Sequence, residues 1–299
     1  MFRLIAILLI PLAAACTPLN VVDQLTPRDG YRVTLAVAYG QEPRQRYDLY
    51  QPTEPRLGSP TIVFFYGGSW QAGNRADYRF VAQAFTSAGY RVAIPDYRLY
   101  PDVTFPAFVQ DAAAAVAHIT RREQTPVIVM GHSAGAHLAL LFTLDQRYLA
   151  AENLTVTDTI TAAIGLAGPY DFRPLSATMT QILAPTGDSA PSQPITAARG
   201  DAPPVLLMHG ALDAIVQPGN TDRLAARLNA LSGDVTVRRY SAIGHLSLIG
   251  ALAGPMRFLA PVRADILAYL RRFEPQATAG FTPLAGPWDN SRQHPRPEP

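Results

Sequence analysis

The stretch that decides the fold is Val127–Leu140, which reads VIVMGHSAGAHLAL. A short apolar run rich in β-branched residues ends in Gly131–Gly135 (GHSAG), and a helix pattern of small and apolar residues follows at once. This order predicts a strand, a sharp turn and a helix, with Ser133 at the apex of the turn. The two glycines remove Cβ atoms that would clash in so tight a turn. The stretch therefore predicts a nucleophilic serine. The alternative is an ordinary turn in which Ser133 only caps the helix.

Strand and helix patterns alternate on both sides of this stretch. Besides the central strand, apolar or alternating runs predict strands at Tyr31–Tyr39, Gln45–Tyr50, Thr61–Phe65, Arg91–Ile94, Ile160–Leu166, Val205–Met208 and Val235–Tyr240. Helical stripes occupy Asp77–Ala88, Phe105–Ile119, the segment up to Leu144, Asn220–Leu231 and Pro261–Phe273. The alternation predicts an α/β fold with about eight strands in a mostly parallel sheet and helices on both faces. Val33, Leu35 and Val37 alternate with polar or small residues and predict a half-buried first strand.

Composition fits one enzyme-sized domain and argues against a nucleic-acid partner. The chain has 299 residues, of which 48% are hydrophobic, enough for a single large core. The formal net charge is only +2, and no basic block of the nucleic-acid-binding type is present. We expect no metal or organic cofactor, because no clustered set of ligands is visible in the sequence.

The first residues have the pattern of an export signal. Arg3 is followed by the apolar or small residues Leu4–Ala15, a run too short to cross a bilayer, and then by Cys16. The residues before Cys16, the sole cysteine, resemble the lipobox of bacterial lipoproteins. Residues 1–16 are thus expected to direct export from a bacterial cytoplasm and to end in a lipidated Cys16 facing the periplasm or cell surface. The alternative is a plain secretory signal with an incidental cysteine.

The same analysis divides the remaining chain into three parts. We expect a tether over residues 17–30, a folded domain over 31–273 and a disordered Pro-rich tail over 274–299. Contact with a membrane is expected only through the N-terminal lipid.

A serine hydroxyl needs a base that removes its proton and an acid that orients the base. In folds with this strand–turn–helix arrangement the partners follow in the order serine, acid, histidine. Asp213 lies in the loop after the strand at Val205–Met208, and His245 follows the last strand. Asp201 and Asp234 precede strands and are expected to be turn residues. The other histidines lie in helices, beside Ser133, before a glycine or in the tail: His118, His132, His137, His209 and His294.

Stabilising the oxyanion of the reaction requires backbone N–H donors near Ser133. One is expected from Ala134, directly after the serine, and the others from the loop after the third strand, Tyr66–Trp70 (YGGSW). Adjacent glycines let this backbone turn its N–H groups inward, and we assign Gly68 and Ser69 as donors.

These motifs together resemble one branch of the α/β-hydrolase superfamily. Tyr66–Trp70 is similar to the His-Gly-Gly-x-Trp loop of hormone-sensitive-lipase-like carboxylesterases, kynurenine-formamidase-like enzymes and bacterial feruloyl-esterase-like proteins. Asp96–Pro101, followed by Phe105-Pro106 and Asp111, is similar to another segment of that branch. The resemblance covers roughly residues 31–273 and implies hydrolysis, without fixing the substrate. The family usually has His where this chain has Tyr66. We expect Trp70 and Tyr66 to wall the substrate pocket and Asp96, Arg98 and Asp111 to be structural.

The expected function is hydrolysis of carboxylic esters through Ser133, His245 and Asp213, with an acyl-enzyme intermediate. The insertion Ala167–Pro203 forms a short cap with few large apolar residues, and it lacks the amphipathic helix of a lipase lid. We therefore expect small, short-acyl or aromatic ester substrates. Two alternatives stay open, namely an N-formyl amide hydrolase and a catalytically silent, exported binding lipoprotein. The oligomeric state is not fixed by the sequence.

Overall fold

A computed structural model describes residue 22 and residues 25–274 of the chain. The expected signal peptide with Cys16, most of the expected tether, and the expected tail from residue 275 onward lie outside the described residues. Within the described part no helix is both long and apolar enough to cross a membrane.

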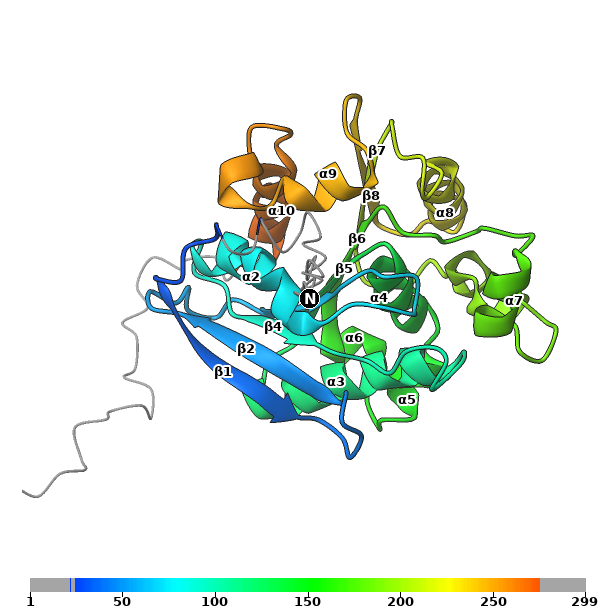
Figure 1. Cartoon of the computed structure of the whole chain (residues 1–299), viewed down its shortest axis with the longest axis horizontal. Helices are drawn as coiled ribbons and strands as arrows, with labels where there is room; N and C mark the ends of the chain where they lie inside the picture. The colour runs from blue at the N-terminus through cyan, green and yellow to red at the C-terminus, as the bar shows by residue number, and fades with distance from the viewer. Residues whose placement is uncertain (1–21, 23–24, 275–299) are drawn as a thin grey trace, which may run out of the picture.

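One eight-stranded sheet forms the centre of the molecule (Figure 1). The strand order is β1-β2-β4-β3-β5-β6-β7-β8. β1 and β2 pair antiparallel, β2 is antiparallel to β4, and every other neighbouring pair is parallel. The strands are β1 (Tyr31–Ala38), β2 (Arg46–Pro52), β3 (Thr61–Phe65), β4 (Val92–Pro95), β5 (Val127–His132), β6 (Ile160–Leu166), β7 (Val205–Gly210) and β8 (Val235–Tyr240). The expected eight-stranded, mostly parallel sheet is confirmed.

Helices cover both faces of the sheet (Figure 1). α2 and α10 lie together on one face, where Arg263 Nε donates to the carbonyl of Ala84. α3 and α4 pack against each other on the opposite face, and the ring of Phe142 meets that of Phe65 on β3. The main helices are α2 (Arg79–Thr86), α3 (Ala107–Glu123), α4 (Ala134–Leu144), α8 (Gly219–Ala230) and α10 (Val262–Leu270). Shorter ones are α5 (Arg147–Ala150), α6 (Val156–Thr159), α7 (Ala177–Leu183) and α9 (His245–Gly250).

The buried central strands determine which edge of the sheet carries the candidate catalytic residues. Every residue of β3, β5 and β7 is buried, as continuous apolar runs in a sheet covered on both faces require. The carboxyl ends of β5, β7 and β8 lie on one edge of the sheet because these strands are parallel neighbours through β6. Ser133 follows β5, Asp213 follows β7 and His245 follows β8, so the topology brings three distant segments to one edge.

The expectation of a half-buried first strand holds only near its two ends, where Tyr31 and Val37 are partly buried against the core. β1 lies at the edge of the sheet, where it pairs only with β2, and the side chains of Val33 and Leu35 are exposed. The strand also carries a bulge between Thr34 and Val37, with Ala36 at a φ of 55°. Alternation alone could not identify the buried side chains, because among the described elements β1 packs chiefly against β2.

Candidate active site

Ser133 lies on a strained turn that only glycines can surround. Its φ of 55° and ψ of −124° fall outside the regions that side-chain-bearing residues normally adopt. A Cβ on Gly131 would lie 2.2 Å from the carbonyl oxygen of Gly135, and one on Gly135 would lie 2.1 Å from that of Phe65. The helix α4 begins directly after the serine, so its first N–H groups face the same space. The local sequence thus forces this turn, with Ser133 half-buried at its apex.

Asp213 and His245 meet across the loops that follow β7 and β8. His245 Nδ1 donates to Asp213 Oδ2 over 2.7 Å, and Asp213 Oδ1 accepts the backbone N–H groups of Ile215 and Val216 at 2.9 Å each. Burial raises the pKa of the Asp213 carboxyl, but the hydrogen bonds from His245 and from these amides outweigh burial and lower it overall. Asp213 is therefore ionised at neutral pH, and it leaves Nε2 of His245 as the nitrogen that can accept a proton.

Among the described residues, no hydrogen bond of normal length joins the Ser133 hydroxyl to His245. Such contacts are often long in ligand-free enzymes and shorten when substrate binds. The two residues are nevertheless linked through His132, the neighbour of Ser133. Its ring centroid lies 4.7 Å from that of His245, and its Nε2 lies 3.2 Å from the carbonyl oxygen of His245.

The loop after β3 passes directly against Ser133. A Cβ on Gly67 would lie only 2.9 Å from the Cβ of Ser133. Gly68 has a φ of 131° and Ser69 a φ of 53°, which turns the loop sharply. Within the described part of the chain, the backbone N–H groups of Gly68, Ser69 and Ala134 donate to no other group, so they are available for a substrate oxygen.

Tyr66 lies beneath this loop and not in the wall of the pocket, contrary to our expectation. Its side chain is fully buried and its ring stacks on that of Tyr97 at 5.0 Å. Its hydroxyl donates to Asp96 Oδ1 at 2.7 Å and accepts from Arg44 Nη2 at 2.7 Å. Burial raises the pKa of Tyr66 well above its usual value, so it stays a neutral phenol. Tyr66, which stands where the family usually has His, supports the loop from below through these contacts.

A second carboxylate, that of Asp111 on α3, anchors the segment that follows β4. Asp111 on α3 accepts hydrogen bonds from Arg98 Nε at 2.8 Å and Nη2 at 2.7 Å, in a two-pronged ion pair. Both Asp111 and Asp96 are buried and face other protein groups instead of the cavity beside Ser133. These contacts are the structural ones that the sequence led us to expect.

A cavity of about 260 Å³ opens beside Ser133. Its lining contains no charged side chain and comprises Ser69, Trp70, Ser133, Ala134, Pro169, Phe172, Met179, Ile215, Val216, Gln217 and Asn220. Trp70, which we expected in the pocket wall, stacks on Phe172 with ring centroids 6.0 Å apart. Phe172 and Met179 come from the insertion between β6 and β7, with Met179 on α7. The cavity is thus small, neutral and largely apolar.

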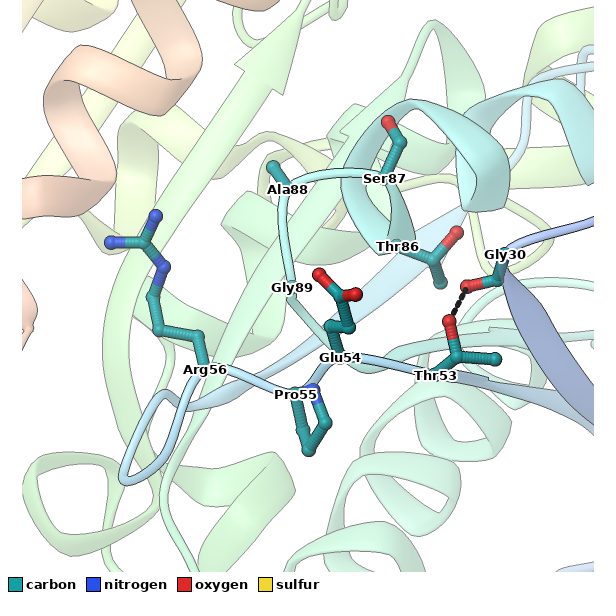
Figure 2. A pocket seen from close by; sticks show the side chains of 9 residues that line it. All are labelled: Gly30, Thr53, Glu54, Pro55, Arg56, Thr86, Ser87, Ala88 and Gly89. Carbon is teal, nitrogen blue, oxygen red and sulfur yellow. Dashed lines mark hydrogen bonds between the residues drawn. The ribbon is translucent and has the colours of Figure 1, made fainter.

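A larger cavity, of about 640 Å³, lies away from Ser133, near the amino ends of β3 and β4. Figure 2 shows the residues that line it. It is formed by the segments that precede β3 and β4, where Thr53 Oγ1 donates to the carbonyl of Gly30. None of the site residues predicted from the sequence lines it. Although this cavity is larger than the one beside Ser133, we therefore do not assign it as the active site.

Two histidines near the acid and base were not predicted as site residues. His132 contacts His245 as described above. His209, the second-last residue of β7, has Nε2 within 3.2 Å of Asp213 Oδ2 and 2.9 Å of the carbonyl of Val216, and Nδ1 within 2.8 Å of Thr221 Oγ1. A histidine at the end of an otherwise apolar strand, close to a predicted site residue, was the signal available in the sequence.

Two buried histidines should make the fold sensitive to mild acid. Burial lowers the pKa of His132 from 6.5 to about 3 and that of His137 from 6.5 to about 4. Between pH 6.5 and about pH 4 the unfolded chain therefore binds more protons than the folded one, and the free energy of unfolding falls as the pH is lowered. By pH 5 we expect each histidine to cost about 2 kcal/mol relative to pH 8.

Urea unfolding at both pH values measures this loss. The variant His137→Gln keeps a donor for the carbonyl of Ser192, which His137 Nε2 contacts at 2.6 Å, but it cannot titrate. It should lose about 2 kcal/mol less than the native chain between the two pH values. Equal losses in both proteins would contradict the assignment of His137 as a buried neutral group.

Comparisons with known proteins find relatives that are esterases and formamidases. An isoprenylcysteine alpha-carbonyl methylesterase of Arabidopsis thaliana is 26% identical over 253 residues, which cover 76% of this chain and 59% of the relative. A kynurenine formamidase of Drosophila melanogaster is 32% identical over 157 residues, or 51% of each chain. The chain thus spans about half the length of the curated relatives it matches.

The fold and family follow from two further matches. Esterase B of Lactobacillus rhamnosis superposes with a TM-score of 0.72 at 21% identity, covering 85% of this chain and 90% of that one, which shows a shared α/β-hydrolase fold. The model of the BD-FAE family matches residues 47–228, more than half of the chain, and this range includes both Ser133 and Asp213. The protein is thus a member of the BD-FAE family with the α/β-hydrolase fold.

Proposed function

We propose that the protein is a serine hydrolase that cleaves carboxylic esters through Ser133, His245 and Asp213. The observation that carries the proposal is the 2.7 Å contact between His245 and an ionised Asp213, at the sheet edge that also presents Ser133 on its strained turn. Unengaged amides beside a neutral cavity add the means to stabilise an oxyanion. An esterase activity in one relative and an amidase activity in another fit the same machinery.

The reaction would proceed in two halves. His245 Nε2 takes the proton of Ser133 as the hydroxyl oxygen attacks the ester carbonyl, and Asp213 stabilises the imidazolium that forms. The carbonyl oxygen becomes negative and is bound by the N–H groups of Gly68, Ser69 and Ala134. His245 then protonates the departing alcohol, which leaves an acyl group on Ser133. Water, activated by the same imidazole, hydrolyses this acyl-enzyme.

The cavity limits the acyl half of the substrate. Its volume of about 260 Å³ is smaller than most drug-sized ligand sites, and the walls offer no charged partner. The cap insertion contributes Phe172 and Met179 to this enclosure and carries only the seven-residue helix α7. We therefore propose short-acyl or small aromatic-acyl esters as substrates.

Hydrolysis of N-formyl amides is the second candidate, because the Drosophila relative is a kynurenine formamidase. The deciding experiment compares acetate, butyrate, hexanoate and decanoate esters with an N-formyl arylamine, alongside labelling by a fluorophosphonate. We expect labelling, rapid acetate and butyrate hydrolysis and a steep decline with longer acyl chains. Turnover of the formamide alone would favour the second candidate. A folded protein that is neither labelled nor active would favour a silent binding module.

His132 should act as a positioning residue in this mechanism. It fixes the main chain of His245 by a hydrogen bond from Nε2, and this bond ties the base to the residue beside the nucleophile. Replacing His132 with Leu should lower kcat roughly 10- to 100-fold with little change in KM, because the imidazole loses its alignment. His132→Gln, whose side-chain amide can donate from the same place, should retain most of the activity. Steady-state kinetics beside thermal unfolding separates the cases, since equal losses in both variants would point to packing alone.

A further inference from the structure

The proposed mechanism fixes the direction in which the alcohol half of an ester must lie. His245 has to protonate the departing oxygen, so that oxygen must face the imidazole. We place the acyl half in the cavity beside Ser133, because Ser69 and Ala134 line this cavity and His245 does not. The alcohol half therefore extends over the surface beside His245 and Asp213, outside the cavity.

That surface is built from two loops that are hydrogen-bonded to each other. The backbone N–H of Leu212 donates to the carbonyl of Ile243 at 3.0 Å, and a Cβ on Gly244 would lie 3.4 Å from the carbonyl oxygen of Leu212. The loop that carries Asp213 and the loop that carries His245 thus form one continuous surface. Their side chains next to the catalytic pair belong to the same part of the surface.

The large exposed side chains on this two-loop surface are apolar. Leu212, which precedes Asp213, is 65% exposed, and Leu246, which follows His245, is 47% exposed. Ile215 is 66% exposed and also lines the cavity beside Ser133, so it connects the two regions. Only eight large hydrophobic side chains in the described residues are exposed, and three of them lie within two positions of the acid or the base. Isolated exposed leucines are ordinary, but their gathering at one reactive edge is not.

We propose that Leu212, Ile215 and Leu246, here called the apolar rim, bind the alcohol half of the substrate. The inference rests on the proposed function and extends it to a substrate class, namely small-acyl esters of apolar alkyl or aryl alcohols. Leucine and isoleucine side chains gain by covering hydrocarbon and offer nothing to a hydroxyl-rich alcohol such as a sugar. Continuity of Ile215 with the cavity places this surface directly beyond the scissile bond.

The test compares two acetates whose alcohol chains have the same number of heavy atoms, heptyl acetate and 2-(2-methoxyethoxy)ethyl acetate. The ether oxygen makes the second alcohol the better leaving group, so a preference for heptyl acetate cannot come from reactivity. We expect the native enzyme to favour heptyl acetate by about tenfold in kcat/KM, since burial of its chain against two leucines is worth roughly that factor.

The double variant Leu212→Ser, Leu246→Ser should reduce this ratio to near one. A ratio is independent of the fraction of enzyme that is folded, so partial misfolding does not imitate the result. The matched control is Leu57→Ser, because Leu57 is 74% exposed in the loop before β3, at the opposite edge of the sheet, and the native ratio should persist.

Two outcomes overturn the proposal in distinguishable ways. Equal turnover of both acetates by the native enzyme, or an unchanged ratio in the double variant, rejects the apolar rim while the esterase proposal stands. Hydrolysis of neither ester, with no fluorophosphonate labelling of Ser133, rejects the esterase proposal and the rim together.

Discussion

Replacing Ser133 with alanine should lower kcat for acetate esters by about 10⁶-fold and abolish labelling by a fluorophosphonate. The hydroxyl oxygen of Ser133 is the atom that would attack the carbonyl, and neither the cavity nor the amides of Gly68 and Ala134 can replace it. Those amides still favour a tetrahedral intermediate formed by water, so a small residual rate above the uncatalysed reaction is expected. Steady-state kinetics with an aryl acetate, together with mass spectrometry of the labelled protein, measures both effects.

The fold should survive this change. Alanine meets the same steric conflict as serine at a φ of 55°, and the N–H at position 133 still donates to the carbonyl of Leu166. Ser87→Ala is a suitable control because Ser87 lies just after α2, remote from the reactive edge. Undiminished labelling or turnover in Ser133→Ala would show that the nucleophile is another residue.

Replacing Asp213 with asparagine should lower kcat by about 10⁴-fold at neutral pH by imposing the wrong tautomer on His245. The position of Oδ1 receives two backbone N–H groups, from Ile215 and Val216, so the carbonyl oxygen of the new amide must remain there. Its NH₂ group then faces His245 Nδ1 and can only donate to it. The proton of the neutral imidazole is forced onto Nε2, and His245 can no longer accept the proton of Ser133.

The control for this prediction is Asp201→Asn. Asp201 precedes β7 at the other end of the strand, where it pairs with Arg199 at 2.8 Å on the surface. Its neutralisation should leave kcat within about twofold of the native value, since exposed ion pairs contribute little. Comparable losses in the two variants would mean that Asp213 acts through general electrostatics or folding and does not orient His245.

Local sequence pattern was enough to locate the eight strands and the five longer helices. The strands Thr61–Phe65, Ile160–Leu166 and Val235–Tyr240 begin and end where the sequence places them. Buried central strands are continuous apolar runs, and amphipathic helices repeat every three to four residues, so both leave a readable period. Helix α9 was missed because it is only six residues long and has no such period.

Glycine spacing determined the turn at Ser133 for a similar reason. The clashes that a Cβ would cause at Gly131 and Gly135 arise from backbone that the neighbouring strand and helix supply. The order of serine, acid and histidine came from the order that these partners take in folds with this strand–turn–helix motif, and Asp213 and His245 stand at the matching places in the chain. These features depend on short stretches or on the sequence order of elements, both of which a single sequence contains.

Contacts between distant segments were decided only by the tertiary structure. His132 reaches the carbonyl of His245 because the parallel strands β5 and β8 deliver their carboxyl ends to one edge of the sheet. The burial of Tyr66 depends on Arg44 and Asp96.

The side chains around the substrate site were settled in the same way. Phe172 and Met179 come from a cap insertion without a clear sequence period, and their place in the cavity wall depends on how that insertion folds over the sheet. The sequence determined where strands, helices and tight turns form, and so which side chains follow each strand. These elements arise locally, because they satisfy backbone hydrogen bonds and avoid steric clashes within short stretches of chain. The tertiary structure alone decided which of those side chains touch, because such contacts depend on the packing of segments far apart in the chain.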